Sequence, residues 1–170
     1  LEKQILNSQW CDNSSKTKVL NKMIAMVDTS ASMYGDPLYA AISLGCRVAE
    51  KSLLGKRVMT FNTKPEWINL SNCNDYISMV SKINECSWGR STNFYLALDM
   101  IIDAYISNNI HPDEAEDMIL VIFSDMQINE ADNNFNGSMM ETIKKKYESI
   151  GLYKYNIPYK VPHILFWNLR

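Results

Sequence analysis

The sequence predicts an α/β fold: a mostly parallel central sheet with one antiparallel edge strand and helices on both faces. Three observations favour it. Apolar runs that suit buried strands alternate along the chain with segments of helical periodicity. Two short strand-like stretches on either side of a turn, within residues 58–70, predict a hairpin at the sheet edge. The length of 170 residues and the apolar content of 46% suit one globular domain with a sizeable core.

The first elements lead to a central strand. Residues 1–20 start with a helix-like stretch and continue through a polar cluster at 13–16, which predicts a loop. We therefore expect an N-terminal lead-in segment, residues 1–20, followed by one domain, residues 21–170. Residues 23–27 are apolar at every position, which is typical of a strand covered on both faces.

The next segments alternate between helices and short strands. Asp36 as N-cap and Pro37 at the first helical position predict the start of a helix that ends by Gly55. Residues 58–61 and 66–70 form the predicted hairpin. Apolar positions at helical spacing then predict helices over 76–83 and 94–105.

The last third of the chain repeats the pattern. Residues 118–123 predict another buried strand, which ends at a Ser-Asp pair. Ser138 and Glu141 have the spacing of a capping box and predict a helix that ends before Gly151. Residues 163–167 predict the last strand.

Composition excludes several classes of protein. The net charge of -2 argues against a surface built throughout to neutralise phosphates, and no apolar run is long enough for a membrane span. The N-terminus has no signal-peptide pattern, and the four cysteines form no CxxC pair, so we expect free thiols in an intracellular, cytoplasmic protein. Because the chain begins at Leu1 and stops at Arg170 directly after an apolar run, we expect it to be a fragment.

One loop carries the pattern Asp-x-Ser-x-Ser, formed by Asp28, Ser30 and Ser32 directly after the first buried strand. Open α/β sheets bind ligands at this carboxyl edge. A carboxylate and two hydroxyls at alternate positions can turn toward one point, and such hard oxygens select magnesium, calcium or manganese. Two further candidates are Thr92, in a Gly/Ser loop before a helix, and Asp125, directly after another buried strand.

In order and spacing, these three segments resemble the metal-ion-dependent adhesion site (MIDAS) of the von Willebrand factor A (vWA) family, over residues 21–170. The resemblance implies a Rossmann-like vWA fold that lacks the family's last strand and helix and so leaves one sheet edge exposed. It also implies a Mg²⁺ ion, or Mn²⁺ or Ca²⁺, whose open coordination position accepts an acidic group of a partner protein. The implied metal ligands are Asp28, Ser30, Ser32, Thr92 and Asp125.

Four longer sequence segments resemble a more specific protein family. Residues 27–33, 88–94, 123–126 and 166–170 resemble an uncharacterised family of plants and giant DNA viruses, which is in turn similar to the vWA domain of the Ro autoantigen. Arg90 departs from the vWA pattern, where a glycine is frequent, and Asn93 stands where many relatives have an aspartate. The side chains expected at the partner-contact rim are Met33, Tyr34, Arg90, Asn93 and Met126.

The sequence therefore predicts a monomeric, metal-dependent binding module and not an enzyme. Walker, Gly-x-Ser-x-Gly and His-Glu-x-x-His motifs are absent, and the third position of the aspartate loop is Ser30 rather than the aspartate of aspartyl-phosphate enzymes. Two alternatives remain: an RNA-associated scaffold domain of a Ro-like ribonucleoprotein, to which the lysines at 144–146, Lys154 and Lys160 would contribute, and a structural vWA domain without a functional metal. His111 and His163 are expected to be structural.

Overall fold

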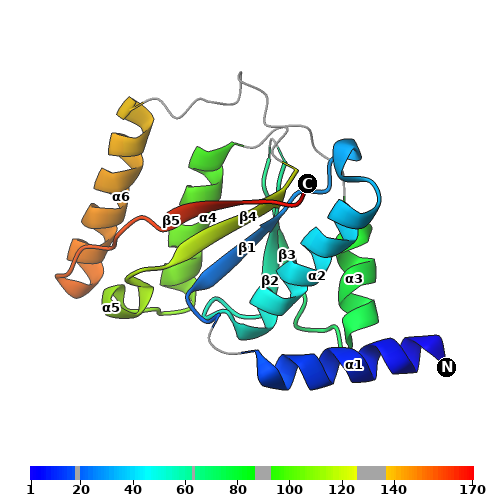
Figure 1. Cartoon of the computed structure of the whole chain (residues 1–170). Helices are drawn as coiled ribbons and strands as arrows, with labels where there is room; N and C mark the ends of the chain where they lie inside the picture. The colour runs from blue at the N-terminus through cyan, green and yellow to red at the C-terminus, as the bar shows by residue number, and fades with distance from the viewer. Residues whose placement is uncertain (18–19, 63, 87–92, 126–136) are drawn as a thin grey trace.

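The computed structural model describes residues 1–17, 20–62, 64–86, 93–125 and 137–170 (Figure 1). Strands and helices alternate along most of the chain, with one hairpin near the middle. In order, the elements are α1 (Glu2–Lys16), β1 (Met23–Val27), the short 3-10 helix η1 (Ala31–Met33), α2 (Asp36–Lys51), β2 (Arg57–Thr60), β3 (Trp67–Asn69), α3 (Tyr76–Asn84), α4 (Phe94–Ser107), α5 (Pro112–Ala115), β4 (Ile119–Ser124), α6 (Gly137–Tyr155) and β5 (His163–Asn168).

The five strands form one sheet in the order β3-β2-β1-β4-β5. The pairs β2–β1, β1–β4 and β4–β5 are parallel, whereas β3 runs antiparallel to β2 at one edge. The predicted α/β fold with one antiparallel edge strand is confirmed. In this topology the carboxyl ends of β1 and β4 lie side by side, at the edge where open α/β sheets bind ligands.

Helices cover both faces of the sheet, as predicted. Helices α2 and α3 pack on one face, and α4 and α6 pack on the other (Figure 1). Strand β1 shows the alternation of side chains that this requires, because Ala25 and Val27 belong to the α2 side and Ile24 and Met26 to the α4 side. All four are at most 2% exposed, which explains the unbroken apolar run.

The predicted loop at 13–16 is wrong, because α1 continues through Lys16. Tertiary contacts hold this polar helix against the domain. The ring of Trp10 stacks on Tyr76 at 4.1 Å between centroids, and its Nε1 donates to Glu50 at 2.8 Å. The guanidinium of Arg47 lies 3.6 Å from the centre of the same ring. These contacts order a segment whose sequence alone is a weak helix former.

Helix α6 also continues beyond its predicted end and includes Gly151. The chain returns from α6 to β5 directly across this glycine. A Cβ on Gly151 would lie 2.4 Å from both the carbonyl oxygen of Ile157 and the amide nitrogen of Tyr159. Glycine is needed here for close approach of two backbone segments rather than for ending a helix.

Strand β5 lies at the edge of the sheet opposite β3. Leu165, Phe166 and Trp167 keep 43%, 37% and 48% of their surface exposed, which agrees with the expectation of an exposed edge. No helix among the described residues is long and apolar enough to span a membrane.

Candidate metal centre

The polar loop after β1 and the end of β4 are brought together by the sheet. Val27 pairs with Phe123 in the parallel ladder, and the amide of Asp28 donates to the carbonyl oxygen of Phe123 at 3.0 Å. Asp28 and Asp125 therefore directly follow the carboxyl ends of two neighbouring strands, β1 and β4. Their exposed fractions are only 3% and 6%, so two carboxylates are buried within one short stretch of the sheet edge.

The carboxylate of Asp28 is held by two donors from different segments. Its Oδ1 accepts from the backbone amide of Ser30 at 2.8 Å, and its Oδ2 accepts from the hydroxyl of Ser124 at 2.6 Å. The first bond tightens the loop after β1, and the second ties that loop to β4. Since an ionised carboxylate has about four lone-pair sites, both oxygens keep acceptor capacity for a cation or its bound water.

The hydroxyls of Ser30 and Ser32 converge, as the alternate spacing predicts. Their oxygens lie 3.0 Å apart, at hydrogen-bond distance. Ser30 is the N-cap of η1 and Ser32 lies within its single turn, so the two hydroxyls meet at the start of this short helix. The structure thus places Asp28, Ser30 and Ser32 in one polar cluster in the loop after β1, and the bond from Ser124 ties this cluster to the end of β4.

The carboxylate of Asp125 forms an ion pair with the guanidinium of Arg170, a residue far from it in the sequence. The Nε of Arg170 lies 3.5 Å from the Oδ2 of Asp125, and the Nη2 of the same guanidinium donates to the carbonyl oxygen of Ser32. Arg170 follows β5, which pairs with β4, so the sheet order also explains this contact. One guanidinium therefore bridges the loop after β1 and the end of β4.

The donor set has the chemistry of a hard-cation site. Its groups are two buried carboxylates and two hydroxyls, all oxygen, with one positive charge from Arg170. Their formal charge is −1, and buried carboxylates are costly without compensating cations. Oxygen ligands of this kind suit Mg²⁺, Mn²⁺ or Ca²⁺. No group of three or more His, Cys, Asp or Glu side chains placed to hold a metal occurs among the described residues, so this site would depend on its hydroxyls.

Three of the predicted site residues, Thr92, Arg90 and Met126, lie outside the described residues. Asn93 is described and caps α4, where its side-chain oxygen accepts from the amide of Leu96 at 3.2 Å. Its exposed position remains compatible with the predicted partner-contact rim.

The prediction of Met33 at the rim is wrong. Met33 has no exposed surface and packs in the core beneath α2, because η1 turns its last side chain toward the sheet. Tyr34, the next residue, is 81% exposed and stays available to a partner.

Sequence reasoning did not identify two residues of this cluster, Ser124 and Arg170. Ser124 was visible as a polar residue at the end of an apolar strand, directly before Asp125. Ser124 and Asp28 each follow directly after one member of the last pair of the parallel register, Val27 with Phe123, and this is the signal that could have found Ser124. Arg170 had no comparable signal, because its contacts depend on the position of β5 beside β4.

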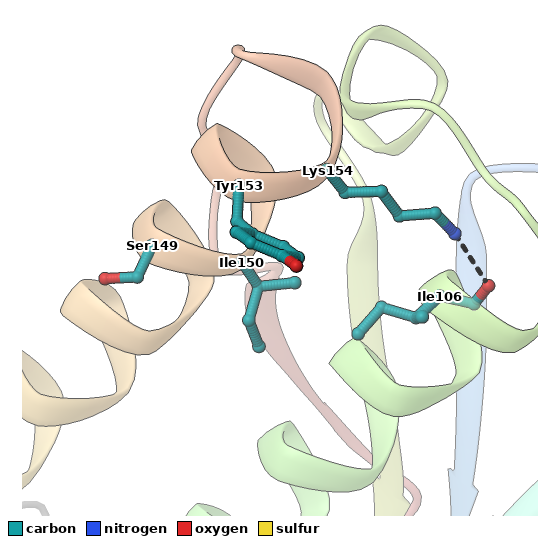
Figure 2. Close-up of a pocket in the computed structure, with 5 residues that line it drawn as sticks. All are labelled: Ile106, Ser149, Ile150, Tyr153 and Lys154. Atoms are coloured by element: carbon teal, nitrogen blue, oxygen red, sulfur yellow. Dashed lines mark hydrogen bonds between the residues drawn. The ribbon is translucent and has the colours of Figure 1, made fainter.

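Other candidate groups have structural settings. His111 caps α5, where its Nδ1 accepts from the amide of Asp113 at 3.4 Å, which agrees with the structural role expected for it. All four cysteines are free thiols. An open, apolar hollow lies between α4 and α6, near the amino ends of β4 and β5 and therefore away from the polar cluster (Figure 2). It is lined by Ile106, Ser149, Ile150, Tyr153 and Lys154.

Together, fold and site define an α/β protein whose parallel sheet carries a cluster of carboxylates and hydroxyls at its carboxyl edge. Comparison with known proteins identifies the family to which the chain belongs. The chain belongs to the family described as Domain of unknown function (DUF7788), whose model matches residues 22–170. It is similar to "Uncharacterized protein L728" of Acanthamoeba polyphaga mimivirus, with 34% identity over 172 residues. That alignment covers 98% of this chain but only 28% of the viral protein.

Proposed function

We propose that this chain is a vWA-type binding module that holds one divalent cation and engages an acidic group of a partner protein through it. The observation that supports the proposal is the position of Asp28, Ser30, Ser32 and Asp125 directly after the adjacent carboxyl ends of β1 and β4. These are four of the five residues that match the MIDAS pattern, and Thr92 completes the proposed set. The mimivirus relative agrees with the resemblance to proteins of giant DNA viruses.

Each residue of the site has a defined role in this proposal. Asp28 and Asp125 supply negative charge, and the hydroxyls of Ser30 and Ser32 supply neutral oxygen ligands. Because two carboxylates formally cancel a charge of +2, the bound ion stays electrophilic and accepts a carboxylate oxygen from a partner. In this proposal the exposed side chains of Tyr34, which follows η1, and of Asn93, which follows Thr92, contact that partner.

The amide of Ser30 and the hydroxyl of Ser124 fix the carboxylate of Asp28 before any ligand arrives. A group that is already oriented loses little conformational entropy on binding. The carboxylate of Asp28 in the proposed site is therefore preoriented at the carboxyl ends of two neighbouring strands.

Isothermal titration of Mg²⁺, Mn²⁺ and Ca²⁺ into chelator-treated protein tests the proposal. Asp28→Asn and Asp125→Asn remove one charge each with little change of shape, and Asp103→Asn on the exposed surface of α4 is the control for charge alone. We expect saturable binding by the wild type and by the control, with a loss of about tenfold or more in both site variants. Binding that is equal in all four proteins would refute the proposed ligands.

The alternative function, an RNA-associated scaffold, has weaker support. Of the lysines that would form its basic surface, Lys146 pairs with Asp99 and Lys160 pairs with Glu116. Lysines already paired with carboxylates contribute less to phosphate binding. A salt-dependent affinity for RNA that falls in a Lys144→Gln, Lys145→Gln double variant, and that persists in a chelator, would favour this alternative.

A further inference from the structure

Arg170 joins the two halves of the candidate metal centre. Its Nε forms an ion pair with Asp125 at 3.5 Å, and its Nη2 donates to the carbonyl oxygen of Ser32, which lies in the loop after β1. The side chain of Asp125 is 1% exposed and that of Arg170 is 49% exposed. A half-exposed guanidinium is therefore paired with a buried carboxylate.

A guanidinium and a divalent ion interact with such a carboxylate in similar ways. Both gain energy from its negative charge, and at short range in a poorly solvated site they repel each other strongly. An ion held by Asp125 would lie close to the charge of Arg170 unless that side chain moved away. Its half-exposed position gives Arg170 a direct path into solvent.

We propose that Arg170 is an internal competitor for the divalent cation, so that binding of the ion breaks the Arg170–Asp125 ion pair and Arg170 sets the affinity of the site. The inference rests on the proposed function. With competition of this kind, the apparent affinity for the ion equals the intrinsic affinity multiplied by the fraction of molecules in which the pair is open. The same pair stabilises the protein when no ion is bound, by compensating the buried charge of Asp125.

Titration of Mn²⁺ into chelator-treated full chain tests the competition, with thermal unfolding in chelator as a second readout. The variant Arg170→Gln removes the charge and keeps a polar side chain. Lys22→Gln is the matched control, because Lys22 lies at the opposite end of β1 and donates to the carbonyl oxygen of Glu116 at 2.6 Å. Arg170→Lys keeps the charge and loses the planar fork.

We expect Arg170→Gln to bind Mn²⁺ about three- to tenfold more tightly than the wild type and to unfold at a lower temperature in chelator. Arg170→Lys and Lys22→Gln should bind Mn²⁺ within about twofold of the wild type. Opposite changes in affinity and stability distinguish competition from a structural role, because a merely structural loss would weaken both.

Equal or weaker Mn²⁺ binding by Arg170→Gln, beside clear binding by the wild type, would overturn this inference and leave the proposed function standing. An absence of binding in both proteins would overturn the proposed function and this inference together.

Discussion

Replacing Ser124 by alanine tests how strongly the sheet supports the site. The hydroxyl of Ser124 donates to the Oδ2 of Asp28 at 2.6 Å, and the two residues are 1% and 3% exposed. A buried hydrogen bond to a charged group contributes about 1.5–3 kcal/mol. For a chain of this size, each 1 kcal/mol changes the melting temperature by about 2–4 °C, so Ser124→Ala should lower it by about 3–12 °C.

The same change should weaken metal binding, although Ser124 is not a proposed ligand. Groups that orient a ligating side chain typically contribute about 10- to 100-fold to metal affinity. Ser124 holds Asp28 against β4, so without it the carboxylate can rotate away from the hydroxyls of Ser30 and Ser32. We expect a loss of about tenfold in Mn²⁺ affinity in the same titration.

Thermal unfolding in chelator and Mn²⁺ titration give the two readouts, and Ser149→Ala is the control. The hydroxyl of Ser149 also donates a hydrogen bond, to the carbonyl oxygen of Lys145 at 2.7 Å, but on the exposed surface of α6. Removing it should cost no more than about 0.5 kcal/mol. If Ser124→Ala and Ser149→Ala behave alike in both assays, the bond between Ser124 and Asp28 does not support the site.

Three further predictions concern the fold. Gly151→Ala should lower the free energy of unfolding by about 1–3 kcal/mol in urea, although alanine favours helices, because its Cβ would strike backbone atoms; Gly137→Ala, which has open space around it, should cost nothing. Burial raises the pKa of the Cys46 thiol from 9.0 to about 12, so alkylation at pH 8 should modify exposed Cys11 and spare Cys46. Since the unfolded thiol ionises at lower pH, this group's contribution to stability should be complete below about pH 9 and fall as pH rises toward 12. Trp10→Ala should speed hydrogen exchange in α1 and leave the sheet protected, and equal protection of α1 in both proteins would contradict the anchoring role of this ring.

The parts of the fold that the sequence predicts are those with strong local patterns. The unbroken apolar run of β1 requires burial on both faces, and the stretches around β2 and β3 have the spacing of a hairpin. The end of α1 could not be predicted in the same way. Its polar last turn is held by tertiary contacts such as the hydroxyl of Ser14 donating to Glu50 at 3.2 Å, and these join residues far apart in sequence.

The site shows the same division between local and long-range information. Asp28, Ser30 and Ser32 lie within one short loop, so their spacing was sufficient to predict that they converge. Met33 was misplaced at the rim because proximity to the motif says nothing about which way η1 turns its last side chain. Arg170 required the strand order itself, since it is 138 positions from the Ser32 carbonyl that it contacts.

The two aspartates of the candidate site have different neighbours, and these neighbours affect two different properties: the orientation of a ligand and the competition for its charge. A substitution of either aspartate would change both properties at once. Asp28 is held by uncharged donors from Ser30 and Ser124, which can stay in place when a cation binds. Asp125 faces the charged side chain of Arg170, which repels any cation that approaches. The carboxylate of Asp28 is therefore already oriented for a metal ion. The carboxylate of Asp125 must instead leave the guanidinium of Arg170 before it can bind the ion. Arg170 pairs with the side chain of Asp125 but contacts the loop after β1 only through the backbone carbonyl oxygen of Ser32, so a change at Arg170 can alter the strength of ion binding without removing a proposed ligand side chain.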